Sequence, residues 1–144
     1  MKDSFLNILL TIFLISISYF YLIGAKPLIV TSNSMAPLIN KGDLIIVFEK
    51  KDYQLNDVIS FKTKGELVTH RLVVKEKDYF KTKGDANSSV DFGLRAMTDV
   101  LGKVEIIIPF LGFLLIYFQS KYFLYLILIF GIFLLLKKGQ NAKD

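Results

Sequence analysis

Two serines two positions apart are the first residues in this sequence that could do covalent chemistry. Ser32 and Ser34 lie in the segment Ser-Asn-Ser-Met-Ala-Pro at 32–37, directly after a short apolar run that is typical of a strand. A serine that leaves a strand can act as a nucleophile when a base removes the proton of its hydroxyl. An ordinary polar loop is the commoner explanation of a Ser-x-Ser pair, so the segment needs a catalytic partner elsewhere in the chain.

The only histidine, His70, is the natural candidate for that base. It lies in the apolar run 66–74, where the alternation of a strand puts Val68, His70, Leu72 and Val74 on one face. An imidazole among aliphatic side chains is usually a hydrogen-bonded core residue, but it is also well suited to accept a serine proton near neutral pH. One histidine and no cysteine exclude multi-histidine zinc sites, thiolate chemistry and disulfides.

Two carboxylates, Asp85 and Asp91, follow in a loop rich in glycine, asparagine and serine at 83–94. A carboxylate can hold an imidazole in the tautomer whose other nitrogen is free to accept a proton. Aspartates in such loops also commonly cap turns, so both roles stay open at this point. The spacing of the acids does not match an EF-hand loop, and we expect no metal and no cofactor.

The region that carries these residues, 26–105, has the pattern of a small β domain. Short runs rich in Val, Ile, Phe and Thr alternate with turn residues; they lie at 28–31, 44–48, 57–63, 66–74, 79–83 and 103–108. Roughly 80 residues of such strands suit a small, coiled antiparallel sheet or partial barrel. The predicted fold class is therefore mainly β, with a transmembrane segment at each end.

The N-terminal segment, 1–25, is predicted to be a retained membrane anchor. Residues 5–25 carry no charge, and as a helix they would be about 31 Å long, which matches a hydrocarbon core of about 30 Å. This run is longer than the roughly 7–15 apolar residues of a cleavable signal peptide. The chain therefore belongs in a membrane on this interpretation.

The C-terminal region divides into three parts. We predict an irregular apolar segment on the membrane surface at 106–121, a transmembrane segment at 122–136 and a basic tail at 137–144. The positive-inside rule places that tail in the cytoplasm. With both termini inside, the β domain at 26–105 lies on the extracytoplasmic or lumenal side.

The positive net charge of +5 does not indicate a nucleic-acid partner. Between residues 26 and 105, thirteen basic residues face eleven acidic ones, a surplus of only two. The rest of the surplus flanks the apolar segments, where it is a topology signal. A nucleic-acid binder would show a basic face in its folded part.

Together and in this order, the motifs resemble those of type I signal peptidases of the endoplasmic-reticulum and archaeal kind, a subfamily that also occurs in some Gram-positive bacteria. The matching pieces are the segment 32–37, Lys-Gly-Asp-Leu-Ile at 41–45, His-Arg at 70–71, and Lys-Gly-Asp at 83–85 continuing to Asp91. A histidine where the common bacterial subfamily has lysine indicates the Ser-His subfamily. One departure is the loop itself, which reads Gly-Asp-Ala-Asn and ends in a single acid rather than two adjacent ones.

The resemblance implies a membrane-bound serine endopeptidase that removes signal peptides from secreted preproteins after small residues. It implies that Ser34 is the nucleophile, His70 the general base and Asp91 the acid that orients the histidine. Ser32 matches a hydroxyl that helps to form the oxyanion hole together with the Ser34 backbone N–H. Asp85 matches a nearby acid that some members require.

The same resemblance implies signal-peptide-bearing preproteins and the lipid bilayer as partners, and it leaves further membrane subunits open. The implied location is multi-pass, in the plasma membrane of a bacterium or archaeon or in the endoplasmic reticulum. The alternative function is a catalytically inert, membrane-anchored β domain that binds a protein partner. A self-cleaving peptidase like the SOS repressors fits poorly, because those proteins are soluble and use a Ser-Lys pair.

Overall fold

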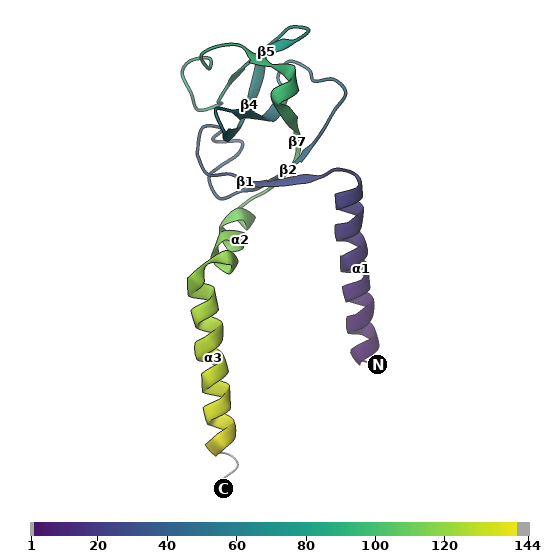
Figure 1. Ribbon diagram of the computed structural model, residues 1–144, viewed down its shortest axis with the longest axis vertical. Coiled ribbons are helices and arrows are strands. Elements are labelled where there is room, and N and C mark those ends of the chain that lie inside the picture. The colour runs from purple at the N-terminus through teal and green to yellow at the C-terminus, as the bar shows by residue number, and fades with distance from the viewer. Residues whose placement is uncertain (1, 141–144) are drawn as a thin grey trace.

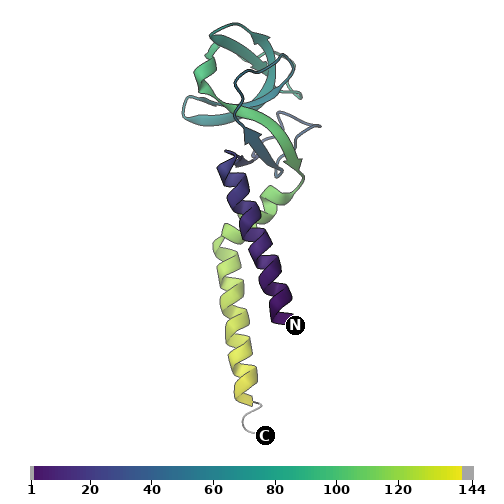
Figure 2. The same cartoon turned by 90° about the vertical axis from the view of Figure 1, so that its right-hand side faces the viewer.

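Seven strands form a single antiparallel sheet in the computed structural model, which describes residues 2–140. Within this part of the chain, one α-helix precedes the sheet and two follow it, and they leave the same end of the β domain (Figures 1 and 2). In chain order the elements are α1 (Lys2–Leu22), β1 (Lys26–Ile29), β2 (Leu44–Phe48), β3 (Val58–Thr63), β4 (Glu66–Lys75), β5 (Tyr79–Lys83), β6 (Arg95–Ala96), the 3₁₀ helix η1 (Met97–Asp99), β7 (Val100–Ile108), α2 (Leu111–Gln119) and α3 (Lys121–Gln140). The prediction of a mainly β, antiparallel fold is confirmed.

The strand order β1-β2-β7-β3-β4-β5-β6 explains how distant segments come together. β7 enters between β2 and β3, so the last strand joins the two halves of the sheet. The sheet stays open, because β1 and β6 are its two outer strands and pair with one neighbour each. The β3–β4 hairpin turns through Lys64 and Gly65, whose φ angles of 48° and 84° are those that a two-residue hairpin loop requires.

Two clusters of buried side chains form the core. The first lies under β1 and β2 and contains Met35, Ile39, Ile45, Val47 and Val58. The second lies between β3, β4 and β5 and contains Tyr53, Ile59, Phe61, Leu72 and Phe80. Because the first cluster includes two residues of the loop that follows Ser34, the core itself holds that loop in place.

Two strand predictions need correction. The last strand, predicted at 103–108, ends at Ile108 as predicted but begins three residues earlier, at Val100; residues 106–108, which the segment predicted at 106–121 also included, lie in the sheet. The short β6 was not predicted, because two residues of strand have too little pattern to stand out from a loop.

The face predicted for β4 also differs at its end. His70 and Leu72 are buried as expected, but Val74 is exposed. The pairing of β4 with β5 shifts between Leu72 and Val74. A bulge of this kind moves the following side chains to the other face of the sheet, which a strict alternation cannot anticipate.

The region predicted as an irregular apolar surface forms a helix instead. α2 follows the turn at Pro109 and Phe110, and α3 continues from it after a bend of 66° at Ser120. In the described residues, α1 is long and apolar enough to cross a membrane over Phe5–Leu22, and the bent pair α2–α3 passes the same test as one broken span. Residues 141–144 of the predicted basic tail lie outside the described residues.

Candidate active site

Three residues from three separate segments form a continuous hydrogen-bonded chain. The hydroxyl of Ser34 lies 3.1 Å from Nε2 of His70, and Nδ1 of His70 lies 2.6 Å from Oδ2 of Asp91. Ser34 belongs to the loop after β1, His70 to β4, and Asp91 to the loop after β5. The fold therefore brings together a hydroxyl, an imidazole and a carboxylate from residues that are 36 and 21 positions apart in sequence.

The position of the imidazole fixes its tautomer. His70 is 8% exposed and pairs with Ile59 of β3, so its ring is held by the sheet. A carboxylate only accepts hydrogen bonds, so the contact with Asp91 places the ring proton on Nδ1. Nε2 is then the acceptor that faces the Ser34 hydroxyl. This is the arrangement that lets a histidine take the proton of an attacking serine.

Thr82 is a member of the site that the sequence reasoning missed. Its hydroxyl donates to Oδ2 of Asp91 over 2.6 Å, and its carbonyl accepts the Asp91 backbone N–H over 2.9 Å. Thr82 is fully buried on the inward face of β5, two residues from Phe80. The sequence did contain a signal for this role: Thr82 is polar, but the alternation of the strand assigns its position to the core.

We expect Thr82→Val to lower kcat/KM by roughly 10- to 100-fold, because a hydrogen bond to a charged group contributes about 1.5–3 kcal/mol. The substitution keeps the shape of the side chain and removes the donor that holds the carboxylate. Ser60→Ala is the matched control, since Ser60 is also fully buried and its hydroxyl bonds Thr69 instead. Steady-state cleavage rates of both folded variants test this, and equal losses in the two would contradict a specific role for Thr82.

Ser32 lies beside Ser34 at the end of this hydrogen-bonded chain. Its hydroxyl is 3.2 Å from the hydroxyl of Ser34, and either oxygen can be the donor. Ser32 is exposed, so its hydroxyl is free to turn toward a bound group. A donor in this position can reach an oxygen that develops negative charge next to Ser34.

Asp85 does not contact His70; it forms a two-point ion pair with the neighbouring Arg71. The Arg71 Nε and Nη2 groups donate to the two carboxylate oxygens over 2.8 and 2.6 Å, and Nη1 donates to the Asn56 carbonyl over 2.8 Å. The hydrogen bonds that Arg71 donates to Asp85 raise the pKa of Arg71, although burial acts in the opposite direction. Of the two roles left open for this acid, turn cap and partner of His70, the hydrogen bonds of the described residues show neither, because both carboxylate oxygens accept from Arg71.

The Asp85 turn packs directly on the backbone carbonyl of Ser34. The Ala86 N–H donates to the Ser34 carbonyl over 2.9 Å. Gly84 comes so close that a Cβ at this position would lie 2.6 Å from the same oxygen. The Arg71–Asp85 ion pair therefore holds the turn at residues 84–86 in place, and this turn supports the backbone of Ser34.

A groove of about 510 Å³ ends at the Ser34–His70 pair. One wall is formed by residues 28–32 and the other by residues 66–70, and the buried side chains of Met35, Ile39 and Ile45 line it as well. Residues 66–70 of β4 pair with β3 on one side only, because the pairing with β5 begins at Arg71. β1 is likewise an outer strand of the sheet. Two backbone edges thus face a groove that suits an extended peptide.

The charged residues of the site do not gather as metal ligands do. In residues 2–140, no three histidine, cysteine or acidic side chains lie close enough to hold one ion. The hydrogen-bonded groups of the site are the side chains of Ser34, His70 and Asp91, with those of Ser32 and Thr82 beside them.

Comparisons with known proteins agree on one kind of enzyme. Residues 25–104 match the family described as Peptidase S24-like. The signal peptidase complex catalytic subunit SEC11 of Debaryomyces hansenii is 30% identical over 117 residues, which cover 69% of this chain and 70% of that protein. The catalytic subunits SEC11C of Rattus norvegicus and of Homo sapiens are each 30% identical over 128 residues, covering 76% of this chain and 67% of theirs.

Proposed function

This chain belongs to the type I signal peptidases of the endoplasmic-reticulum subfamily, within the S24-like serine peptidases, and we propose that it removes signal peptides from preproteins by Ser-His-Asp catalysis. The observation that carries the proposal is the unbroken hydrogen-bonded chain from Ser34 through His70 to Asp91. The names of the relatives support the substrate class, since each is a catalytic subunit of a signal peptidase complex.

In the proposed reaction, Ser34 attacks the carbonyl carbon of the scissile peptide bond while Nε2 of His70 takes its proton. The Asp91 carboxylate stabilises the imidazolium that forms. The oxyanion receives hydrogen bonds from the Ser32 hydroxyl and the Ser34 backbone N–H, each contributing about 3–4 kcal/mol. His70 then donates its proton to the leaving amine, and an acyl-enzyme on Ser34 remains. Water, deprotonated by His70, hydrolyses that ester and releases the signal peptide.

The groove explains why an extended peptide with small side chains would fit. A substrate strand that enters between residues 28–32 and 66–70 can form backbone hydrogen bonds with both edges. Its side chains would meet Met35 and Ile39, which line the groove and are packed into the core. We expect these buried side chains to accept small substrate side chains next to the scissile bond more readily than large ones.

The helices support a location in the membrane. α1 and the α2–α3 pair extend from the same end of the β domain (Figure 2). α2 lies between that domain and α3, and the large apolar side chains at its start and along it, including Phe110, Phe113 and Tyr117, are exposed. We propose two membrane-spanning segments, with α2 lying in the interface between lipid and water and the β domain on the extracytoplasmic or lumenal face.

This topology predicts the labelling of single cysteines by a reagent that cannot cross membranes. The chain has no cysteine of its own, so Lys2→Cys, Lys62→Cys and Lys143→Cys each give one labelling site, Lys143 lying outside the described residues. In intact bacterial cells, only Lys62→Cys should be labelled, because Lys62 is exposed on the β domain. Permeabilised cells provide the control in which all three react. Labelling of either terminus in intact cells would contradict the two-span topology.

The function itself is tested with purified, detergent-solubilised protein and a preprotein whose signal peptide ends in an Ala-x-Ala sequence. We expect release of the mature protein, with its new N-terminus identified by mass spectrometry. If the chain cleaves only in native membranes, it needs further subunits, as the names of its relatives suggest. Absence of cleavage in both settings, with a folded β domain, would favour the alternative of an inert binding module.

A further inference from the structure

The Lys-Gly-Asp motif at 41–43 supplies no group to the proposed reaction, yet its aspartate is one of the few buried charged residues in the part of the chain whose side chains the structure describes. Asp43 is only 3% exposed. Its two carboxylate oxygens accept hydrogen bonds from two different parts of the backbone: Oδ2 from the Asn40 N–H over 2.8 Å, and Oδ1 from the Phe110 N–H over 3.1 Å. Asn40 belongs to the loop that carries Ser34, and Phe110 is the residue directly before α2.

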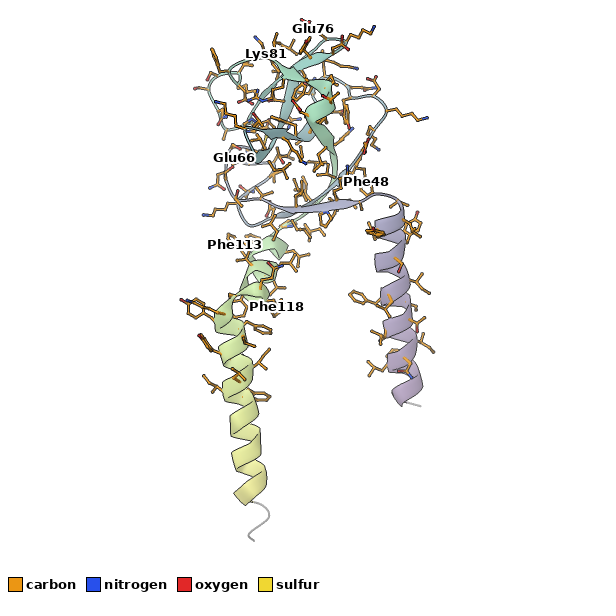
Figure 3. The ribbon with its side chains drawn as sticks, in the orientation of Figure 1. Phe48, Glu66, Glu76, Lys81, Phe113 and Phe118 are labelled. Carbon is orange, nitrogen blue, oxygen red and sulfur yellow. The ribbon has the colours of Figure 1, made fainter. Side chains whose placement is uncertain are left out.

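The contact between the loop and α2 continues beyond this carboxylate. The Phe113 N–H donates to the Gly42 carbonyl over 3.1 Å, and the ring of Phe113 occupies the space that a side chain on residue 42 would need. Figure 3 shows Phe113 where α2 meets the β domain. Gly112 is buried there, and a Cβ on it would lie 2.7 Å from the Gly42 carbonyl oxygen and 2.8 Å from that of Asp43. Glycine at 42 and 112 thus permits the two segments to touch through their backbones.

The same loop also contacts the residue that precedes the proposed nucleophile. The Lys41 N–H donates to the side-chain oxygen of Asn33 over 2.8 Å, and Asn33 is the residue directly before Ser34. A continuous set of contacts therefore leads from the first turn of α2, through residues 40–43, to the backbone beside the reacting hydroxyl. On its other side, this loop is held by Met35 and Ile39 in the core and by the Ala86 N–H on the Ser34 carbonyl.

We propose that Asp43 is a positioning residue that ties the loop of Ser34 to the start of α2 and thereby sets the distance between the Ser34 hydroxyl and His70. The proposal rests on the proposed role of Ser34 as the nucleophile. A misplacement of about 1 Å at a reacting group can cost about 10²-fold in rate. The Ser34–His70 hydrogen bond of 3.1 Å has little length to spare before it is lost. Loosening the contact between residues 40–43 and α2 should therefore affect the chemical step more than substrate binding, because most of the groove is lined by residues 28–32 and 66–70, which lie outside that contact.

The first test compares Asp43→Asn with Asp57→Asn. Asp57 offers a matched local structure, because its Oδ2 accepts the backbone N–H of Gln54 three residues earlier, also over 2.8 Å, but it pairs with Lys103 and not with α2. We expect Asp43→Asn to lower kcat by about 10- to 100-fold with KM changed less than about twofold. Asp57→Asn should lower the melting temperature and leave kcat unchanged when rates are normalised to titrated active sites.

A second pair of variants changes the contact between residues 40–43 and α2 from the side of the helix. This pair stays informative even if Asp43→Asn does not fold. Phe113 and Phe118 are both in α2 and both 47% exposed, but Phe118 packs against Phe123 of α3 and not against Gly42. Figure 3 shows them at opposite ends of the helix. Phe113→Ala should lower kcat by several-fold to about tenfold, whereas Phe118→Ala, with the same loss of apolar surface, should not.

The two pairs give outcomes that separate this inference from the proposed function. Equal kcat for Asp43→Asn and Asp57→Asn, or for Phe113→Ala and Phe118→Ala, would overturn the positioning role, as would a change confined to KM. An active Ser34→Ala variant would instead overturn the proposed function and the inference with it. Loss of kcat in the Asp43 and Phe113 variants, but not in their two controls, supports the positioning role of Asp43.

Discussion

Replacing Ser34 by alanine should reduce the cleavage of a preprotein by at least about 10⁴-fold, because the members of a catalytic triad act as a unit. The side chain is partly exposed, and its removal takes away one hydroxyl and little packing, so the variant should remain folded. Rates are measured on a preprotein by the appearance of the mature product, with circular dichroism as the check on folding.

Ser32→Ala is the internal comparison for this result. Its hydroxyl lies 3.2 Å from that of Ser34 but is not bonded to His70. If Ser32 only donates to the oxyanion, its loss should cost about 10²-fold and leave measurable turnover. Near-normal activity of Ser34→Ala together with an inactive Ser32→Ala would transfer the role of nucleophile to Ser32.

Asp91→Asn should cost on the order of 10⁴-fold in rate while the domain stays folded. The amide that replaces the carboxylate can donate to Nδ1, which favours the tautomer with its proton on Nε2 and removes the acceptor for the Ser34 hydroxyl. The effect should fall on kcat, measured under single-turnover conditions so that product release does not mask it.

Asp85→Asn should act differently, since Asp85 bonds Arg71 and supports the turn on which the Ser34 carbonyl rests. We expect a lowered melting temperature and a smaller loss of rate than for Asp91→Asn. A fully folded Asp85→Asn variant without activity, beside an active Asp91→Asn variant, would reverse the two assignments.

Most of what makes the sheet could be predicted, because each long strand carries its own local signal. The runs at 44–48 and 79–83 match β2 and β5 residue for residue, and the glycine at 65 marks the hairpin between β3 and β4. The approach of Ser34 to His70 followed from the resemblance and from the residue types. The distance between the two side chains could not be derived from their separation in sequence, because it depends on how β7 joins the two halves of the sheet.

The features that escaped prediction are those that depend on contacts between distant segments. Whether Asp85 capped its own turn or paired with Arg71 could not be decided from the loop alone. The helix α2 was hidden because Pro109 and Gly112 normally argue against one; here Pro109 lies before its first turn, and Gly112 permits its contact with the β domain. Thr82 has no neighbour in sequence that reveals its contact with Asp91.

The central claim, that His70 activates Ser34 as the nucleophile, is tested most directly by covalent labelling with a fluorophosphonate probe, which reacts with activated serine hydroxyls. The labelled protein is digested, and the modified peptide is identified by mass spectrometry. We predict a single adduct on Ser34, lost in His70→Ala and in the unfolded wild type, and suppressed by excess preprotein. An adduct on Ser32, or equal labelling of Ser34 when His70 is replaced by alanine, would contradict the mechanism.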